Sequence, residues 1–310
     1  MADSYLTVSD FVADKLDVLQ TTTSNILNDA PFVSQLLRLS PSGGGTTHKY
    51  TVYTTEPTVG FRSENAGRNM SESGDTVTTL TMKILDFSWV VDQATAKGWA
   101  RGSADLIARE GARHLGAALF KWEKQIFNGT VGVGDSDGHT GFRNSTYLDA
   151  VADTMVTNAG GSTANTGSSV YLIRLGENDV AGVTSDDFMI GDTISQMLGA
   201  ADGYYPAYVT PASIWTALQM GGAYSVGRIA NLTADSGKGL TDALIATALG
   251  KFPAGRGPDL IVMNRRSRNQ LQASRTATNS TGAPAPFPME SFGVPIITTD
   301  AISSTEALIS

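Results

Sequence analysis

The sequence contains no cysteine, which excludes a disulfide framework, a thiolate metal site and a cysteine nucleophile. Charge is scarce as well: 17% of the residues are charged, below the roughly 25% that is typical of soluble domains. The net charge of -8 argues against tight binding to nucleic acid, which requires a cationic surface that releases counterions. It does not argue against enclosing DNA without gripping it.

Long apolar runs and targeting signals are also missing. No apolar stretch approaches the roughly 20 residues that are needed to cross a bilayer. The opening stretch MADSYLTVSDFVADKL carries acidic residues and lacks the basic start and apolar centre of a signal peptide. We therefore expect a protein that has no membrane contact and is made in the cytoplasm.

The sequence also lacks motifs for catalysis or metal binding. It has no phosphate-binding loop, no His-Glu-x-x-His pair and no Gly-x-Ser-x-Gly elbow. His48, His114 and His139 share no ligand spacing. The loop at 134–138 resembles the start of a calcium loop, but its twelfth position is Thr146 where a glutamate is needed. We expect no catalytic residue, no metal and no cofactor.

Residues 1–45 predict an N-terminal arm. Their apolar side chains, Phe11 and Phe32 among them, are only loosely periodic, and one short helix is expected at about 10–20. The segment has too few apolar groups to fold alone, so we expect an arm that contacts a neighbouring subunit. The alternative is a helical hairpin packed on its own domain.

Residues 46–92 predict a long β-hairpin. The stretch TTHKYTVYTT at 46–55 alternates and is rich in Thr, Tyr and Val, and 75–92 predict a second, longer strand. The exposed edges of such a hairpin favour pairing with another chain. The polar tip between the strands holds four candidate contacts to a neighbouring subunit: Phe61, Arg62, Glu64 and Arg68.

Residues 103–127 predict the longest helix, about 40 Å at 1.5 Å per residue. Asp105 suits the positive end of the helix dipole, and Gly129 supplies a C-terminal stop. Gly111 and Gly116 lower the intrinsic stability of this helix and suggest a bend or a close approach of another element.

The rest of the chain mixes helices and strands without an internal repeat. Helices are expected at about 147–158, 240–250 and 267–275, strands at 169–175, 259–264 and 292–302, and mixed strand and turn signals at 205–220 and 224–233.

Arg265, Arg266 and Arg268, with Arg275 further on, form the one basic cluster. Such a cluster can contact DNA, pair with acidic groups of a neighbouring subunit, or be a solvated helix start. For an acidic chain we favour pairing between subunits, which adds specificity more than affinity.

Several stretches together resemble the major capsid proteins of tailed bacteriophages with the Hong Kong 97-type fold. They are the helix end QIFNG at 125–129, SVYLIRLGE at 169–177, RIAN at 228–231, DLIVMNRR at 259–266 and FGVPII at 292–297. The resemblance implies an α+β fold with an N-terminal arm (1–45), an extended hairpin loop (46–92) and a peripheral domain (93–164) that holds a spine helix at 103–127. It further implies an axial domain (165–290) and a C-terminal strand (291–310) that returns to the peripheral domain.

The function implied by the resemblance is that of a coat protein. Copies would assemble as pentamers and hexamers in the host cytoplasm into the icosahedral head of the virion, around double-stranded DNA that is not bound sequence-specifically. A separate scaffolding protein is expected because the arm starts almost at once, together with a portal and a possible decoration protein. Three alternatives stay open: an encapsulin-like compartment shell, an enzyme without a recognisable motif, and a β-rich adhesin or tail protein.

Overall fold

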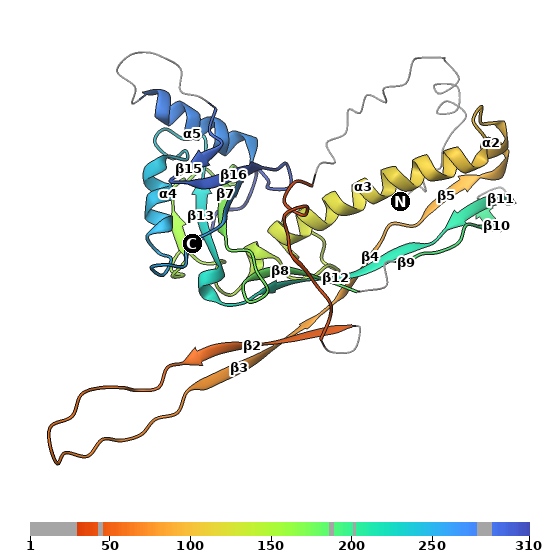
Figure 1. Cartoon of the computed structure of the whole chain (residues 1–310). Coiled ribbons are helices and arrows are strands. Elements are labelled where there is room, and N and C mark those ends of the chain that lie inside the picture. The colour runs from red at the N-terminus through yellow and green to blue at the C-terminus, as the bar shows by residue number, and fades with distance from the viewer. Residues whose placement is uncertain (1–29, 43–45, 186–188, 201–202, 278–286) are drawn as a thin grey trace.

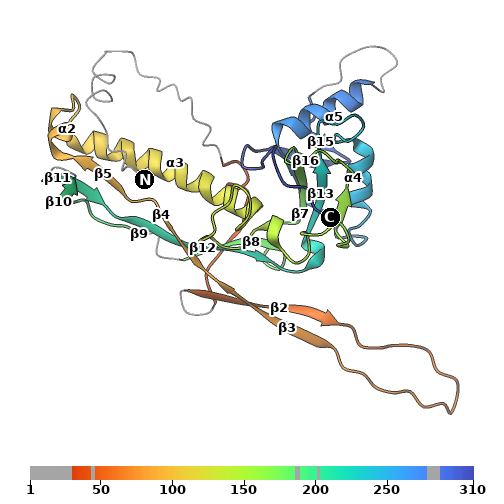
Figure 2. The same cartoon turned by 180° about the vertical axis from the view of Figure 1, so that it is seen from behind.

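The computed structural model describes residues 30–42, 46–185, 189–200, 203–277 and 287–310. Its architecture is α+β. A long helix extends from a body that contains a six-stranded sheet, and a set of long strands runs alongside this helix (Figure 1). A two-stranded hairpin projects away from both (Figures 1 and 2).

The projecting hairpin consists of β2 (Thr47–Thr55) and β3 (Gly74–Thr81), paired antiparallel from Thr47↔Thr81 to Thr55↔Gly74. Thr, Tyr and Val suit these strands because their branched or aromatic side chains fit a pleated surface. Residues 56–73 form the tip and contain no strand. The prediction of a long hairpin is confirmed for this part of the chain.

The prediction of a single strand at 75–92 is wrong, because three strands occupy this range. After β3 come β4 (Lys83–Asp86) and β5 (Trp89–Asp92), and each of the three pairs in a different sheet. The side chains at the two breaks, Met82 and Phe87, are 1% and 6% exposed. Their backbone N–H groups donate to the carbonyls of Thr46 and Ala212, which extends the ladder of the preceding strand by one residue. The chain changes its partner strand after each of these two residues.

The long helix α3 (Ser103–Asn128) begins and ends within one residue of its predicted bounds. The short helix α2 (Gln93–Gly98) precedes it and begins at Asp92, whose carboxylate caps the N–H of Ala94. The predicted close approach at Gly111 is confirmed, since a Cβ there would lie 2.8 Å from the ring of Trp89 on β5. The helix therefore lies directly against the strand.

Two sheets run along α3 (Figures 1 and 2). One has the order β1-β8-β12-β4, with β9 also paired to β12, and the other has the order β10-β11-β5. Their remaining strands are β1 (Arg38–Leu39), β8 (Val180–Thr184), β9 (Met189–Ile190), β10 (Ile194–Ala200), β11 (Gly203–Thr210) and β12 (Ala212–Met220).

The six-stranded sheet has the order β15-β16-β14-β7-β13-β6. These strands are β6 (Val156–Asn158), β7 (Ser168–Ile173), β13 (Val226–Leu232), β14 (Leu260–Met263), β15 (Glu290–Ser291) and β16 (Val294–Thr298). Every residue of β7, β13 and β14 is buried, which explains their nearly continuous apolar sequences. The helices α4 (Asp242–Leu249) and α5 (Arg265–Ala277) lie beside this sheet, and the short helices η1 (Phe142–Asn144) and η2 (Ala223–Ser225) lie in connections.

The helix expected at about 147–158 is wrong. This stretch forms turns followed by β6, which pairs parallel with β13. The carboxylate of Asp153 accepts the N–H of Ala150, and the N–H of Val156 donates to the carbonyl of Asp153. Such local bonds from an Asp side chain favour turns over a helix.

The expected domain bounds stay a prediction, and the sheets cross the bounds at 165 and 290. Strands β8 to β12 fall within 165–290, yet they lie along α3 and not in the six-stranded sheet, whereas β6 lies before 165 and belongs to that sheet. The closing strand β16 pairs with β14 in the six-stranded sheet, and Thr299 and Ala301, which follow it, form hydrogen bonds with α3.

Candidate subunit-contact sites

The hairpin tip brings together four of the predicted contact residues: Phe61, Arg62, Glu64 and Arg68. Residues 56–73 are exposed throughout, and the ring of Phe61 is fully in solvent at 108% exposure. The guanidinium of Arg62 donates to the carbonyl of Ala66 at 3.1 Å, so this side chain orders the tip itself. Two further apolar side chains, Val59 and Met70, are 87% and 100% exposed.

The base of the hairpin is fixed to β12 by buried hydrogen bonds. His48 is 6% exposed, and its Nε2 lies 2.7 Å from Oε1 of Gln219. Its Nδ1 accepts the backbone N–H of Ser42 at 3.3 Å, so Nε2 is the ring nitrogen that donates to Gln219. The hydroxyl of Tyr50 donates to the carbonyl of Met220 at 2.7 Å, and burial raises the pKa of this hydroxyl. A cavity of about 550 Å³ lies beside these groups.

The arm residue Phe32 does not face a neighbouring subunit. It is 0% exposed, and its ring lies 5.1 Å from that of Phe127 on α3 and 6.4 Å from that of Phe142. The prediction that Phe32 is an inter-subunit contact is therefore wrong, because its side chain is already enclosed by its own subunit. The other arm candidate, Phe11, lies outside the described residues.

Glu123 on α3 holds two distant segments to the helix. It is 0% exposed, and its Oε2 accepts the backbone N–H groups of Phe32 and Val33 at 3.0 and 3.1 Å. Its Oε1 accepts the hydroxyl of Thr299. Burial raises the pKa of the Glu123 carboxyl, and the three donors partly offset this effect. The sequence contains a signal for this site, because Glu123 is an acid that lies on the apolar stripe between Leu119 and Ile126.

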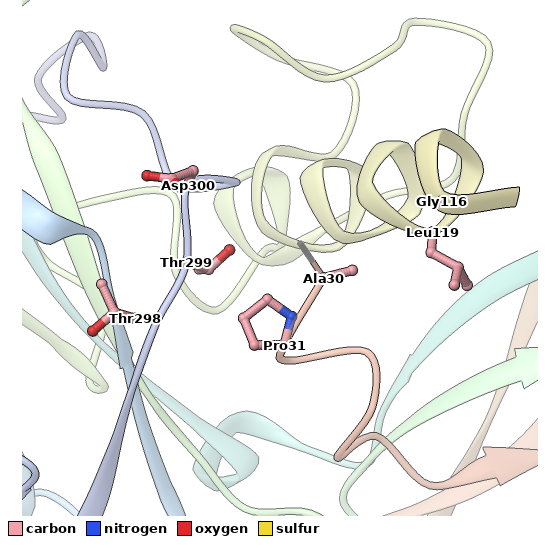
Figure 3. A pocket seen from close by; sticks show the side chains of 7 residues that line it. All are labelled: Ala30, Pro31, Gly116, Leu119, Thr298, Thr299 and Asp300. Atoms are coloured by element: carbon pink, nitrogen blue, oxygen red, sulfur yellow. The ribbon is translucent and has the colours of Figure 1, made fainter. Parts of the chain in front are cut away.

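A cavity of about 500 Å³ opens beside this contact. Figure 3 shows Ala30 and Pro31 of the arm between the helix and the segment that contains Thr298 to Asp300, with Leu119 on the helix side. The arm, α3 and the C-terminal segment thus meet around one partly open space.

The arginine cluster is engaged within its own subunit. Arg265 forms a two-pronged ion pair with Asp300 at 2.7 Å for each contact. Arg266 donates to the carbonyls of Thr166, Leu232 and Ser304, and the guanidinium of Arg268 lies 4.2 Å from the ring centre of Phe287. These partners all lie in the same chain, and pairing of the three arginines with a neighbouring subunit stays a prediction.

A buried ion pair that we did not predict joins β13 of the six-stranded sheet to the C-terminal segment. Arg228 and Glu306 have side chains that are 1% and 3% exposed, and Nη2 of the arginine lies 3.4 Å from Oε2 of the glutamate. The hydroxyl of Ser169 donates to the same carboxylate oxygen at 2.7 Å, and Nη1 of Arg228 donates to the carbonyl of Leu148. The signal in the sequence is a single charge in the otherwise uncharged strand VGRIANL.

The loop at 134–138 is ordered by side chains of α3. Asp135 pairs with Lys121 at 2.8 Å, its N–H donates to Oε1 of Gln125, and the hydrogen bond from Lys121 lowers the pKa of its carboxyl. Across the described ranges, no cluster of three or more His, Asp or Glu side chains could hold a metal ion. No helix in the same ranges is long and apolar enough to span a bilayer.

A family model for the major capsid protein GP7 matches residues 12–310, nearly the whole chain. The chain belongs to this family. It is a major capsid protein of a tailed-phage head, a structural component of the virion and not an enzyme. The family match also decides against the encapsulin-like and adhesin alternatives.

Solved structures agree with this assignment at the level of the fold. A structure of bacteriophage Epsilon15 matches with a TM-score of 0.67 and 18% identity, over 100% of this chain and 98% of that chain. The capsid of bacteriophage JBD30 matches with a TM-score of 0.53 and 12% identity, over 96% of this chain and 99% of that chain. The JBD30 capsid decorated with minor capsid protein trimers matches with a TM-score of 0.52 and 13% identity, over the same shares. No curated protein sequence matches this one.

The fold is thus the α+β Hong Kong 97-type capsid fold, as the sequence predicted, and this capsid protein assembles with copies of itself into a shell.

Proposed function

We propose that this capsid protein forms the pentamers and hexamers of an icosahedral head, and that the hairpin of β2 and β3 holds each subunit to its neighbour. The exposed tip carries this proposal. Phe61, Val59 and Met70 have almost all of their surface in solvent although they stand on an ordered hairpin. A neighbouring subunit that covers them would recover roughly 1.5–3 kcal/mol for each large side chain that becomes buried.

The charges of the tip would set the orientation of this contact. The tip carries charges of both signs within a few residues: Arg62, Glu64 and Arg68. Complementary charges determine the register of an interface more than they raise its affinity. Arg68 lies against Gly60, which keeps its guanidinium on the tip. A hairpin that extends to a neighbouring subunit also allows the subunits to form a closed, symmetric assembly without a large rigid interface.

We propose that sheet membership defines the subdomains of this capsid fold. We assign α3, β4, β5 and strands β8 to β12 to the peripheral domain, and the six-stranded sheet with α4 and α5 to the axial domain. Residues 1–45 remain the proposed arm, with 30–42 anchored on their own subunit through Glu123.

Further partners belong to the same proposal. The JBD30 capsid carries minor capsid protein trimers, and we propose a decoration protein here by analogy, with a separate scaffolding protein and a portal. The head would enclose double-stranded DNA. The net charge of -8 supports a shell that surrounds the genome without binding it tightly or sequence-specifically.

Electron microscopy and light scattering of the purified chain test this proposal. Closed shells, or rings of subunits, are the expected result. A chain that stays monomeric at high concentration, both alone and when co-expressed with phage assembly proteins, contradicts it.

The role of the tip is tested by replacing residues 57–72 with a short turn. The variant should melt within a few degrees of the natural chain, because the tip contributes nothing to the buried core, yet it should give few or no shells. Phe61→Ser is the milder companion, and Val133→Ser, at a partly exposed residue outside the hairpin, is the control. Normal shells from the shortened variant would exclude the tip as a subunit contact.

A further inference from the structure

One long strand at the side of α3 has an open edge. β10 is the last strand of the sheet β10-β11-β5, and its seven residues pair with β11 on one side only. In the part of the body that the structure describes, the other edge strands have two to four residues: β1, β4, β5, β6, β9 and β15. Short edges leave few backbone groups with which another chain can pair, so β10 is the exception.

The sequence of β10, ISQMLGA, does not protect this edge. It contains no charged residue and no proline, and its register with β11 runs from Ile194↔Val209 to Ala200↔Gly203 without a bulge. Met197 at its centre is 58% exposed. Charges, prolines and bulges are the features that prevent an edge strand from pairing with another chain. A regular strand that has none of them favours the addition of a further strand.

The projecting hairpin has the matching edge. β2 and β3 pair only with each other, so each has one open side. β2 carries Lys49, whereas β3 is uncharged from Thr76 to Thr81 and has eight residues against the seven of β10. In one subunit, the hairpin projects away from the body while β10 lies beside the α2 end of α3 (Figures 1 and 2). A strand that pairs with either edge therefore has to come from another chain.

We propose that the open edge of β3 adds to β10 of an adjoining copy, as the fourth strand of the sheet β10-β11-β5. The inference rests on the proposed pentamers and hexamers and names the element of the neighbour that the hairpin binds. A ring of five or six copies needs a head-to-tail contact between two different surfaces of the chain. β3 and β10 are two such surfaces, and their pairing closes both open edges. Pairing of β10 with a second β10 would join copies only in twos and would leave β3 open.

Disulfide crosslinking tests this pairing directly, because the chain has no cysteine of its own. Full overlap of the two strands places Met197 opposite the middle of β3. Met197→Cys is therefore combined in turn with Thr76→Cys, Val77→Cys, Thr78→Cys or Thr79→Cys, and the assembled shells are oxidised. Opposed residues on adjacent strands have Cα atoms about 4.5–5.5 Å apart, which is within the reach of a disulfide. Crosslinks should form at alternate positions only, because successive side chains lie on opposite faces, and should give covalent chains longer than dimers.

The matched control is Met197→Cys with Thr51→Cys. Thr51 lies opposite Val77 on β2, one strand further from β10, and should give no crosslink. A crosslink at Thr51 and none on β3 would overturn the assignment to β3. Covalent dimers from Met197→Cys alone would show that β10 pairs with β10. Equal crosslinking at all four positions of β3 would show proximity without strand pairing, and it would also overturn the proposal.

Lysine on the open edges gives an independent test. Met197→Lys and Val77→Lys change residues that are 58% and 64% exposed, so the melting temperature of the subunit should stay within a few degrees. The concentration needed for shell assembly should rise by about tenfold or more, as for the loss of a central interface contact. Val133→Lys, at a residue 47% exposed outside the hairpin, is the control and should assemble normally.

The outcomes separate this inference from the proposed function. If the natural chain forms shells and both edge variants form them at the same concentration as the control, β3 and β10 are not paired between subunits, although the shell-building function stands. If the natural chain forms no shells, alone or with phage assembly proteins, the proposed function fails and the strand pairing fails with it.

Discussion

The carboxylate of Glu123 accepts the backbone N–H of Val33 at 3.1 Å, although 90 residues separate the two in the chain. With Phe32 and Thr299 as further donors, this one side chain connects the arm, the long helix and the C-terminal segment. Replacement by alanine leaves three buried donors without an acceptor. We expect Glu123→Ala to lower the free energy of unfolding by about 2–4 kcal/mol, measured by urea denaturation.

Glu123→Gln separates the hydrogen bonds from the charge. Because burial raises the pKa of Glu123, the folded state holds the proton more tightly than the unfolded state. The stability that this group contributes is present below its ordinary pKa and is lost as the pH rises through the raised value. Glu123→Gln should therefore gain stability relative to the natural chain as the pH rises above the ordinary pKa of a glutamate carboxyl, about 4.3. A difference that does not change with pH would show that Glu123 titrates normally.

Burial should determine how much each ion pair contributes to the free energy of unfolding. Glu306→Ala leaves the enclosed Arg228 without its counter-ion, and we expect a loss of about 3–5 kcal/mol in the free energy of unfolding. Asp300→Ala breaks the pair with Arg265, whose side chain is 52% exposed, and should cost less than about 1 kcal/mol. Equal losses from the two variants would contradict this account.

The base of the hairpin can be loosened without unfolding the body. His48→Ala removes the hydrogen bond to Gln219 and the acceptor for Ser42, which should cost about 1–2 kcal/mol. Amide hydrogen exchange should become faster in 47–55 and 74–81 and remain unchanged in β7 and β13. Faster exchange throughout the protein would mean that His48 supports the whole fold.

Two truncations test how the arm is anchored. Removing residues 1–42 deletes Phe32, Val33 and Leu36 from the core, whereas removing 1–29 leaves them in place. We expect the longer truncation to melt well below the shorter one, or to be insoluble, because each core side chain of this size contributes roughly 1.5–3 kcal/mol. Identical melting temperatures would show that 30–42 add nothing to the core.

Much of the fold follows from local patterns in the sequence. The helix at 103–128 and the strands around 169 and 260 carry strong periodic or continuous apolar signals, and the structure has them within a few residues. The close approach at Gly111 was also predictable, because a glycine within a helix has a cost that packing can explain.

What the sequence did not predict depends on contacts between distant residues. The breaks at Met82 and Phe87 are set by which sheet each side chain enters, and the apolar pattern of 75–92 continues through both. Phe32 looks like an exposed arm residue until the partners of Glu123 are known. The arginines at 265, 266 and 268 look free because Asp300 and the accepting carbonyls lie up to 100 residues away.

The course of the chain from β3 through β4 to β5 has a mechanical consequence. The three strands follow one another from the hairpin into the body along nearly one line (Figures 1 and 2). A pull on the hairpin by an adjoining subunit would therefore act along β4 and β5, whose hydrogen bonds to β12 and β11 run across that direction. Bonds loaded in this way resist together in shear and do not open one after another. Residues 74–92 can thus act as a tie that spreads a load on the hairpin into both sheets beside α3.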